Sequence, residues 1–294
     1  MESAIDSVLK QTFTDWLIIF VDNASTDESA RLAAQLTPRI RVVKISDKVK
    51  LGAARNIAID NCDGEIIAFL DVDDLWDCEK LSLMIEKFDD PEVALVVSDG
   101  EVFGDEIETT IVRASSDSAG TISVSDMLEN YSLILSSAMI RRSSLESIKP
   151  PFNEDLEICE ETQLFLQLAE SFRVISVNTN LVSVRKHQNN LSGKNPTELL
   201  AELEIMLESI ENTLPGFNSK YKKNIDLLMR RNRLVIAGQL ASAGSFSAAK
   251  SVIVNYLTDP ITILVYVVLC VLPKSIIRFL LSNKLRRGYN RLIR

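Results

Sequence analysis

The sequence predicts an α/β protein whose sheet is mostly parallel, followed by a region that is wholly helical. Short apolar runs, each long enough for a buried strand, alternate with segments in which apolar residues recur at helical spacing. Such alternation is typical of a parallel sheet that helices cover on both faces. After Pro196 only the helical spacing continues. We therefore expect three regions, at residues 1–195, 196–258 and 259–294.

The first predicted element is a helix over residues 2–11, because Ala4, Ile5, Val8 and Leu9 fall on one helical face. In α/β folds of this kind such a helix follows a strand. We therefore expect that strand to be absent from this chain. Two explanations stay open: the natural start lies upstream, which we favour, or the protein is shortened.

Strands and helices then alternate along the chain. We expect strands at 17–21, 39–45, 65–70 and 93–98, and helices at 26–36, 52–61 and 77–88. Ser25 and Glu28 have the spacing of a capping box for the helix at 26–36. Later elements are a helix and a loop that runs into a strand within 121–150, a helix at 160–171, and strands within 174–184. Helices follow at 197–213 and 222–257, with breaks near Pro215-Gly216 and Gly244. Ligands bind beyond the carboxyl ends of parallel strands, so residues that follow strands are site candidates.

Charge and cysteine content exclude several classes of protein. The net charge is −9, which disfavours nucleic acid as a partner because phosphates need a basic face. The four cysteines lie far apart and include no Cys-x-x-Cys pair. This argues against a disulfide framework or a zinc site and suits a reducing cytosol. The opening residues lack the basic and apolar regions of a secretory signal, so we expect a cytoplasmic protein.

The last region combines apolar and basic residues. From Pro260 onward there are seven Lys or Arg residues and no acidic residue. The apolar run at 261–272 is too short for a spanning helix, which needs roughly twenty residues. We therefore expect a segment that lies in the plane of an anionic membrane surface. The alternatives are a buried core helix and a full span over 261–282, which would have to accommodate Lys274 and Arg278.

Three carboxylates follow the predicted strand at 65–70. Asp71, Asp73 and Asp74 repel one another unless a cation or solvent screens them. Oxygen ligands of this kind suit Mg²⁺ or Mn²⁺, which bind one or two carboxylates together with substrate phosphates. A solvated turn and a D-x-D phosphatase of the haloacid dehalogenase type are the alternatives. An EF-hand loop is excluded, because Trp76 would stand at its glycine position.

Four motifs occur in a characteristic order and spacing. They are SVLKQTF at 7–13, VDNASTD at 21–27, GAARN at 52–56 and FLDVDDLW at 69–76. Together they closely resemble glycosyltransferase family 2, a large inverting family, and the resemblance extends from residue 3 to about 192. It implies the GT-A fold, a Rossmann-like domain that binds a nucleotide-diphospho-sugar, here expected to be a UDP sugar.

The resemblance also implies a role for each matching residue. Asp22 would contact the nucleotide base, and Arg55 the nucleotide or its phosphates. Asp71 and Asp73 would form the D-x-D motif, in which Asp73 is the direct ligand of Mn²⁺ or Mg²⁺. Asp71 would contact both the nucleotide and the metal.

Two further stretches, Phe152-Asn153-Glu154 and Glu160-Glu161, resemble the acceptor-side motif of the family. Glu160 and Glu161 stand where the family has Glu-Asp, so Glu161 would be the general base that deprotonates the acceptor hydroxyl. The alternative is an acidic helix N-terminus that the helix dipole favours. RKHQNNLS at 185–192 resembles the family's closing loop and contains His187, the only histidine. His187 is either a ligand of the metal or diphosphate, or a structural residue.

The departures from the family are the missing first strand and the Glu at position 161. The function that the resemblance implies is inverting sugar transfer from a nucleotide-diphosphate donor to a hydroxyl of a lipid-linked glycan, in cell-surface polysaccharide synthesis. The protein would be peripheral at the cytoplasmic face of the cell membrane. The phosphatase remains one alternative, and a catalytically inactive membrane-bound relative is another, which the departures favour.

Overall fold

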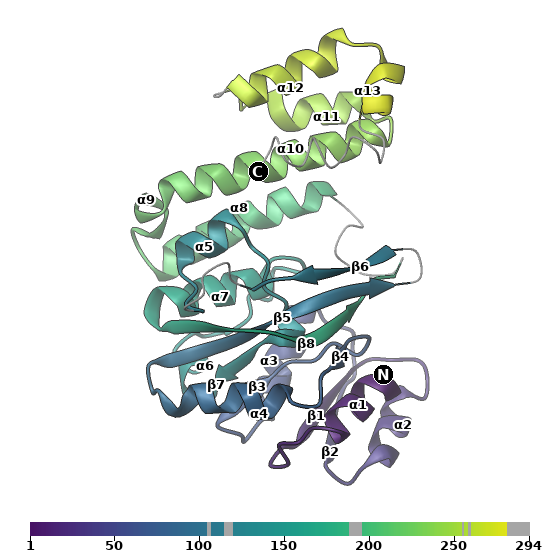
Figure 1. The fold of residues 1–294 in the computed structure, drawn as a ribbon, viewed down its shortest axis with the longest axis vertical. Helices are drawn as coiled ribbons and strands as arrows, with labels where there is room; N and C mark the ends of the chain where they lie inside the picture. The colour runs from purple at the N-terminus through teal and green to yellow at the C-terminus, as the bar shows by residue number, and fades with distance from the viewer. Residues whose placement is uncertain (105–106, 115–119, 188–195, 255, 258–259, 281–294) are drawn as a thin grey trace. The chain divides into compact units, whose positions relative to one another are not determined.

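The computed structural model describes residues 1–104, 107–114, 120–187, 196–254, 256–257 and 260–280. The chain divides into two compact units, Met1–Leu191 and Ser192–Arg294. The first unit contains all the described strands, and the second is helical (Figure 1). The predicted separation of a final region at residue 259 stays a prediction.

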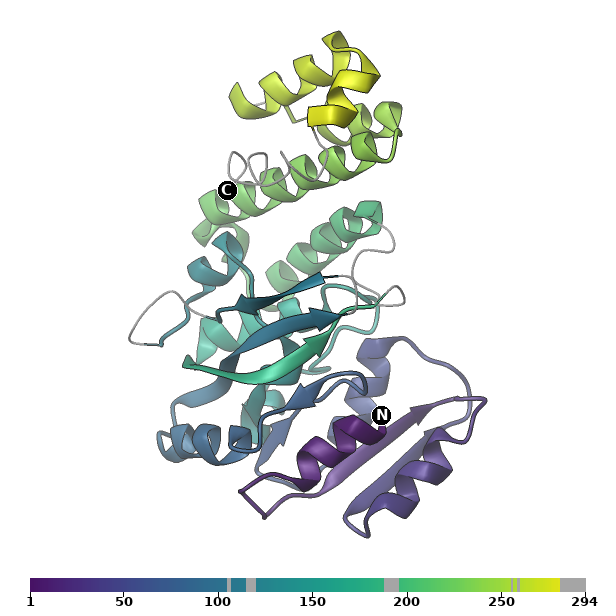
Figure 2. The same cartoon turned by 45° about the vertical axis from the view of Figure 1, so that its right-hand side comes forward.

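The first unit begins with a small parallel sheet and its helices. After α1 (Glu2–Leu9), β1 (Ile18–Asn23) pairs in parallel with β2 (Ile40–Ile45) along the whole of both strands. Helix α2 (Ser29–Leu36) lies along these strands (Figure 2), and α3 (Leu51–Asp60) follows them. The order of these elements is the predicted one, with boundaries shifted by a few residues.

The turn after β1 differs from the prediction. Ser25 and Glu28 do not form a capping box, and α2 begins at Ser29 without a side-chain cap. Instead, Asp22 Oδ1 accepts a hydrogen bond of 3.1 Å from the backbone N–H of Ser25. Asp27 Oδ1 accepts one of 3.0 Å from Ser29 in the same way. Aspartates that bind nearby backbone groups favour turns over helix, so α2 starts later than predicted.

A six-stranded sheet forms the centre of the first unit. Its strands lie in the order β3 (Ile66–Ala68), β7 (Met139–Arg141), β5 (Val93–Gly104), β8 (Arg173–Arg185) and β4 (Leu75–Trp76), and β6 (Ile107–Val112) also pairs with β5. The long β5–β8 ladder is parallel, whereas the four remaining ladders are antiparallel.

The α/β prediction is confirmed, but parallel pairing holds only for the two longest ladders, β1–β2 and β5–β8. The antiparallel ladders arise largely from β4 and β7, which have two and three residues. Strands this short do not produce a period in the sequence that could be recognised. The sheet is therefore mixed.

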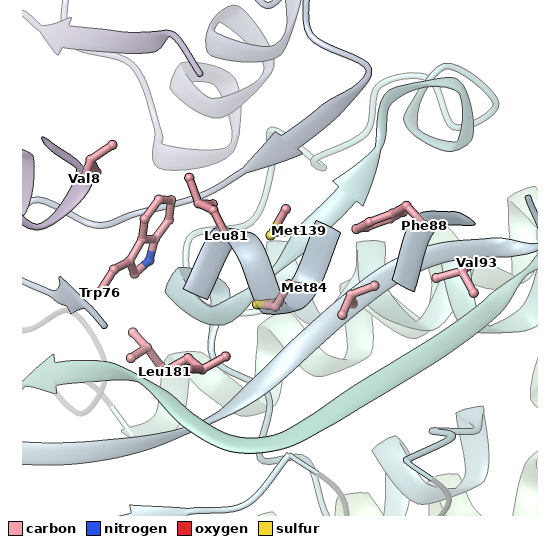
Figure 3. Packing of buried hydrophobic residues seen from close by; sticks show 10 residues of the cluster. Val8, Trp76, Leu81, Met84, Phe88, Val93, Met139 and Leu181 are labelled. Atoms are coloured by element: carbon pink, nitrogen blue, oxygen red, sulfur yellow. The ribbon is translucent and has the colours of Figure 1, made fainter. Parts of the chain in front are cut away.

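An apolar core lies against the six-stranded sheet. Trp76 packs there with Val8 of α1, Leu81 and Met84 of α4, and Leu181 of β8 (Figure 3). The predicted helix at 77–88 is shorter, because Trp76 pairs into the sheet as β4 and the chain turns before α4 (Lys80–Ile85) and the 3-10 turn η1 (Glu86–Asp89). The other helical elements of this unit are α5 (Val124–Glu129), η2 (Leu135–Ser137), α6 (Arg142–Leu145) and α7 (Glu160–Ser171).

The second unit contains α8 (Pro196–Thr213), α9 (Phe217–Lys220), α10 (Lys222–Ser242), α11 (Phe246–Val254), α12 (Pro260–Val271) and α13 (Lys274–Leu280). The predicted breaks are confirmed at Gly216 and Gly244, whose positive φ angles of 93° and 89° suit glycine. Side chains of α10 to α13 form one apolar core. In the part of the chain that the structure describes, none of the helices combines the length and the apolar character that crossing a membrane requires.

Candidate active site

The loop between β3 and β4 presents two of its three carboxylates to solvent. The side chains of Asp71 and Asp73 are 50% and 32% exposed, whereas Asp74 is 4% exposed. A hydrogen bond of 3.1 Å from the backbone N–H of Asp74 to the carbonyl of Asp71 closes the turn. Burial raises the pKa of the Asp74 carboxyl to about 6. The loop therefore offers Asp71 and Asp73 to a ligand and directs Asp74 into the protein.

His187 lies against this loop, just beyond the end of β8. Its Nε2 atom is 2.8 Å from Oδ2 of Asp73, although 114 positions separate the two residues. The structure thus brings together Asp73, which the resemblance assigns to the metal, and His187, for which a metal or diphosphate role was one of the two predicted roles. Residues 188–192 of the predicted closing loop lie outside the described residues.

The chemistry of these donors fits a hard divalent cation that arrives with phosphate. Carboxylate oxygens suit Mg²⁺ and Mn²⁺, and imidazole is acceptable to transition metals. Among residues whose positions are described, no three His, Cys, Asp or Glu side chains form a cluster that could hold a metal. A nucleotide-bound cation needs only one or two protein carboxylates, because phosphate and water supply the remaining ligands. Asp71 and Asp73, with His187, meet that smaller requirement.

Arg55 joins the acidic loop to helix α7. Its guanidinium makes an ion pair with Glu160, and both side chains are buried. The second terminal nitrogen of Arg55 lies 3.4 Å from Oδ1 of Asp71. A buried carboxylate is strongly unfavourable without a counter-charge, and Arg55 supplies such a charge to Glu160. Three of the predicted site residues therefore form one charged group.

Glu161 follows Glu160 in the first turn of α7 and is half-buried. Burial is the main reason why the pKa of its carboxyl rises to about 8, and the charges of Glu160 and Asp71 add to the rise while Arg55 opposes it. The alternative interpretation, an acid placed only to suit the helix dipole, predicts a lowered pKa. A carboxyl of raised pKa is instead the kind of group that accepts a proton near neutral pH.

Asp22 lies at the end of β1, where its side chain is buried in its own turn. Ala24 in this turn has a φ angle of 56°, a left-handed conformation that is uncommon for residues other than glycine. Asn23 holds the opposite side, since its amide exchanges two hydrogen bonds, of 2.8 and 2.9 Å, with the backbone of Val49. Asp22 thus stands in a loop that hydrogen bonds hold at Ser25 and at Val49.

Sequence reasoning missed Asn56. Its side chain exchanges two hydrogen bonds of 2.9 Å with the backbone of Phe152 and donates a third, of 3.0 Å, to Glu154. Next to it, a Cβ added to Gly52 would come within 2.8 Å of the carbonyl oxygen of Asn153. Helix α3 is therefore in close contact with the segment that precedes α7. The signal in the sequence was that GAARN at 52–56 and the stretch at 152–154 both belong to recognised motifs.

Comparison with known proteins identifies a family and several relatives of this chain. The family model described as glycosyl transferase family 2 matches residues 1–149. The UDP-Glc:alpha-D-GlcNAc-diphosphoundecaprenol beta-1,3-glucosyltransferase WfgD of Escherichia coli is 24% identical over 226 residues, which cover 73% of this chain and 83% of WfgD. WfaP of Escherichia coli, an enzyme of the same description, is 26% identical over 208 residues, which cover 69% of this chain and 79% of WfaP.

A solved structure matches the fold. The crystal structure of Staphylococcus aureus TarS 1-349 in complex with UDP-GlcNAc has a TM-score of 0.63 at 13% identity, and the match covers 98% of this chain and 88% of that one. At this identity the likeness concerns the fold alone. It shows that the chain has the GT-A fold.

The Arg55–Glu160 pair generates a prediction about stability. Arg55→Met should lower the free energy of unfolding by about 3–5 kcal/mol, because it removes the positive charge that Arg55 places against the buried Glu160. The double variant Arg55→Met/Glu160→Gln should recover part of that loss, since no buried charge remains. Urea denaturation measures both.

The matched control is Arg41→Met, which breaks an exposed ion pair with Asp63 and should cost about 1 kcal/mol or less. If Arg55→Met were no more destabilising than Arg41→Met, the pair would not have the structural role assigned to it here.

Proposed function

The chain belongs to glycosyltransferase family 2, and from this premise we propose that it transfers a sugar, with inversion, from a UDP sugar to a hydroxyl of a lipid-linked glycan. The observation that carries the proposal is the group in which Arg55 contacts both Asp71 and Glu160, next to Glu161. In this group the carboxyl of Glu161, whose pKa is raised, is close enough to Asp71 of the exposed D-x-D loop to be affected by its charge. WfgD and WfaP, which by name use UDP-Glc and a diphosphoundecaprenol-linked acceptor, support this donor and acceptor class.

The proposed reaction needs one proton transfer and one displacement. The carboxylate of Glu161 accepts the proton of the acceptor hydroxyl, and the acceptor oxygen attacks the anomeric carbon from the face opposite the leaving group. The bond from that carbon to the donor phosphate breaks, and its electron pair leaves with the nucleotide diphosphate. Glutamate has one more methylene than the aspartate usual in the family, and it performs the same transfer if it reaches the hydroxyl.

Residues on the donor side would hold the nucleotide and its charge. Asp73, Asp71 and His187 would hold Mn²⁺ or Mg²⁺ together with the diphosphate. Such a cation neutralises the negative charge that develops on the departing diphosphate. Asp22 would accept a hydrogen bond from the nucleotide base. Arg55 would keep Asp71 oriented towards the donor while it balances the charge of Glu160.

Exposed apolar side chains in the second unit support the proposal that a membrane surface is a further partner of the protein. Among the residues that the structure describes, fifteen large apolar side chains are exposed, and eight of them lie in the interval 254–276. On α12, Leu264 is 57% exposed and Val271 71% exposed, although the opposite side of this helix packs into the apolar core. A helix that is apolar all round is normally covered. The basic residues from Lys274 onward favour an anionic lipid surface as the cover.

We therefore propose that the protein acts while peripherally bound at the cytoplasmic face of the membrane, where a lipid-linked acceptor is accessible. Membership of family 2 argues against the D-x-D phosphatase interpretation. A catalytically inactive relative remains distinguishable by experiment, because it would bind the nucleotide without turnover.

The donor site is tested by calorimetric titration of UDP into the purified protein, with and without Mn²⁺. We expect metal-dependent binding that Asp73→Ala weakens by at least about tenfold, because a direct ligand is lost. Asp126→Ala, in the exposed cap of α5, is the control and should bind as the wild type does. Equal affinity of Asp73→Ala and wild type would remove Asp73 from the metal site.

The role of Glu161 predicts a pH dependence. The base acts only when ionised, and its pKa is raised to about 8 in the free protein. The value of kcat/KM should therefore fall about tenfold per pH unit below that value and level off above it. Glu161→Gln should reduce kcat by about 10²–10⁴-fold, and Glu161→Asp should retain more activity than Glu161→Gln. A rate for Glu161→Gln close to that of the wild type would show that another group takes the proton.

The membrane surface is tested by co-sedimentation with vesicles of phosphatidylglycerol or phosphatidylcholine. Wild type should bind the anionic vesicles more tightly, and Leu264→Asp/Val267→Asp should weaken that binding by at least about tenfold, because two apolar contacts are lost. Ile111→Asp, which changes an equally exposed apolar residue of β6, is the control. Binding that the double variant leaves unchanged would exclude this face of α12.

A further inference from the structure

We propose that Asp74, which the reaction described above does not use, is a positioning residue whose buried carboxylate holds the end of β8 so that His187 stays beside Asp73. The importance of this position rests on the proposed function, because Asp73 and His187 are expected to hold the metal and the diphosphate. The positioning itself rests on hydrogen bonds that are independent of any ligand.

The Asp74 carboxylate joins three segments that are far apart in the sequence. Its Oδ1 accepts a hydrogen bond of 3.0 Å from the backbone N–H of Arg185, at the end of β8. Its Oδ2 accepts one of 2.6 Å from the hydroxyl of Ser136 in η2. The Ser136 hydroxyl oxygen in turn accepts a hydrogen bond of 3.1 Å from the backbone N–H of Asp71. One side chain therefore ties the acidic loop, η2 and β8 together.

The bond to Arg185 extends the contact between β8 and the acidic loop. The β4–β8 ladder pairs Trp76 with Val182 and Leu75 with Ser183, and it goes no further. On the other side of the strand, the backbone N–H of Lys186 donates a hydrogen bond of 2.7 Å to the carbonyl of Phe103. His187 follows directly. The end of β8 is thus held between Asp74 and β5, and this fixes the direction in which His187 leaves the strand.

The burial of Asp74 restricts its carboxylate to the two hydrogen-bond donors described above. Asp74 is 4% exposed, so water does not compete for its two hydrogen bonds. Both oxygens of the carboxylate are used by donors at fixed positions, one on a backbone and one on a short side chain. A shorter or apolar side chain would leave the Arg185 N–H without this acceptor, and β8 would lose its attachment to the loop that carries Asp73.

A purely structural role for Asp74 is the alternative, and Asp99 provides the matched comparison. Asp99 is 3% exposed and accepts a hydrogen bond of 2.8 Å from the backbone N–H of Ala114. Its second partner is the side chain of Arg113, at 3.4 Å. It is therefore a carboxylate of the same type, burial and number of partners, but its hydrogen bonds are made to a different part of the sheet.

The test uses the single histidine as a probe. Because His187 is the only histidine, the imidazole region of a ¹⁵N–¹H spectrum of the untagged protein contains one residue. In the folded wild type its nitrogen shifts should differ from those of the same protein in concentrated urea. Asp74→Ala should move them most of the way to the urea values, whereas Asp99→Ala should leave them in place. Asp74→Asn should keep the wild-type shifts, because the amide oxygen can still accept the Arg185 N–H.

If Asp74→Ala does not fold, Asp74→Ser replaces it, since serine keeps a polar group but is one bond too short to place an oxygen where Oδ1 meets Arg185. Wild-type shifts in the folded Asp74→Ala or Asp74→Ser variant would overturn the proposal, as would an equal displacement in Asp99→Ala. The affinity for UDP in the presence of Mn²⁺ should also fall by about 10–100-fold in Asp74→Ala and not in Asp99→Ala. If the wild type bound no UDP but the imidazole shifts behaved as expected, the proposed function would fail and the positioning role would stand.

Discussion

The candidate site depends on one buried ion pair, the contact between Arg55 and Glu160. Arg55 comes from a helix near the small parallel sheet, Glu160 begins the helix on the acceptor side, and Asp71 belongs to the acidic loop, so a single guanidinium joins three segments of the chain. Breaking such a pair by removing one partner is far more unfavourable than losing a surface pair, because the remaining charge stays buried. Glu161 lies next to this pair: burial is the main cause of the raised pKa of its carboxyl, and the charges of Arg55, Glu160 and Asp71 modify that rise.

The ordered motifs predicted much of this group, because short motifs in a recognised order mark chain segments that meet in space. The sequence placed Asp71 and Asp73 after a strand, Arg55 on a helix and Glu160 at a helix start, and the structure agrees. The roles of these residues in catalysis stay predictions. The attachment of β8 through Asp74 could not be predicted, since its two bonding partners are 62 and 111 residues away and follow no period. The two-residue strand β4 was missed for the same reason: it is defined by pairing with β8 and not by its own composition.

Each of the two units contains some side chains that depart from the usual distribution of polar and apolar residues, and each departure supports a proposed function. In the first unit, charged side chains such as Arg55 and Glu160 are buried, where apolar residues are expected. In the second, Leu264, Val271 and their neighbours are exposed, where polar residues are expected. The first is stabilised by pairing of opposite charges within the protein. The second consists of apolar side chains that stay exposed among the described residues of the unit, which is why we propose a lipid surface as its partner.

The contact between α3 and the segment before α7 has a consequence for how sequences of this kind can diverge. Asn56 and Phe152 are 96 residues apart, yet the side-chain amide of Asn56 is hydrogen-bonded to the backbone of Phe152. The space at Gly52 excludes even a methyl group. Insertions and deletions between these positions can therefore accumulate without disturbing the contact, as long as the connecting loops absorb them. We expect the residues at 52–56 and those at 152–154 to change together or not at all. In related genes, we would look for drift in length between the motifs, combined with a glycine at the position of Gly52.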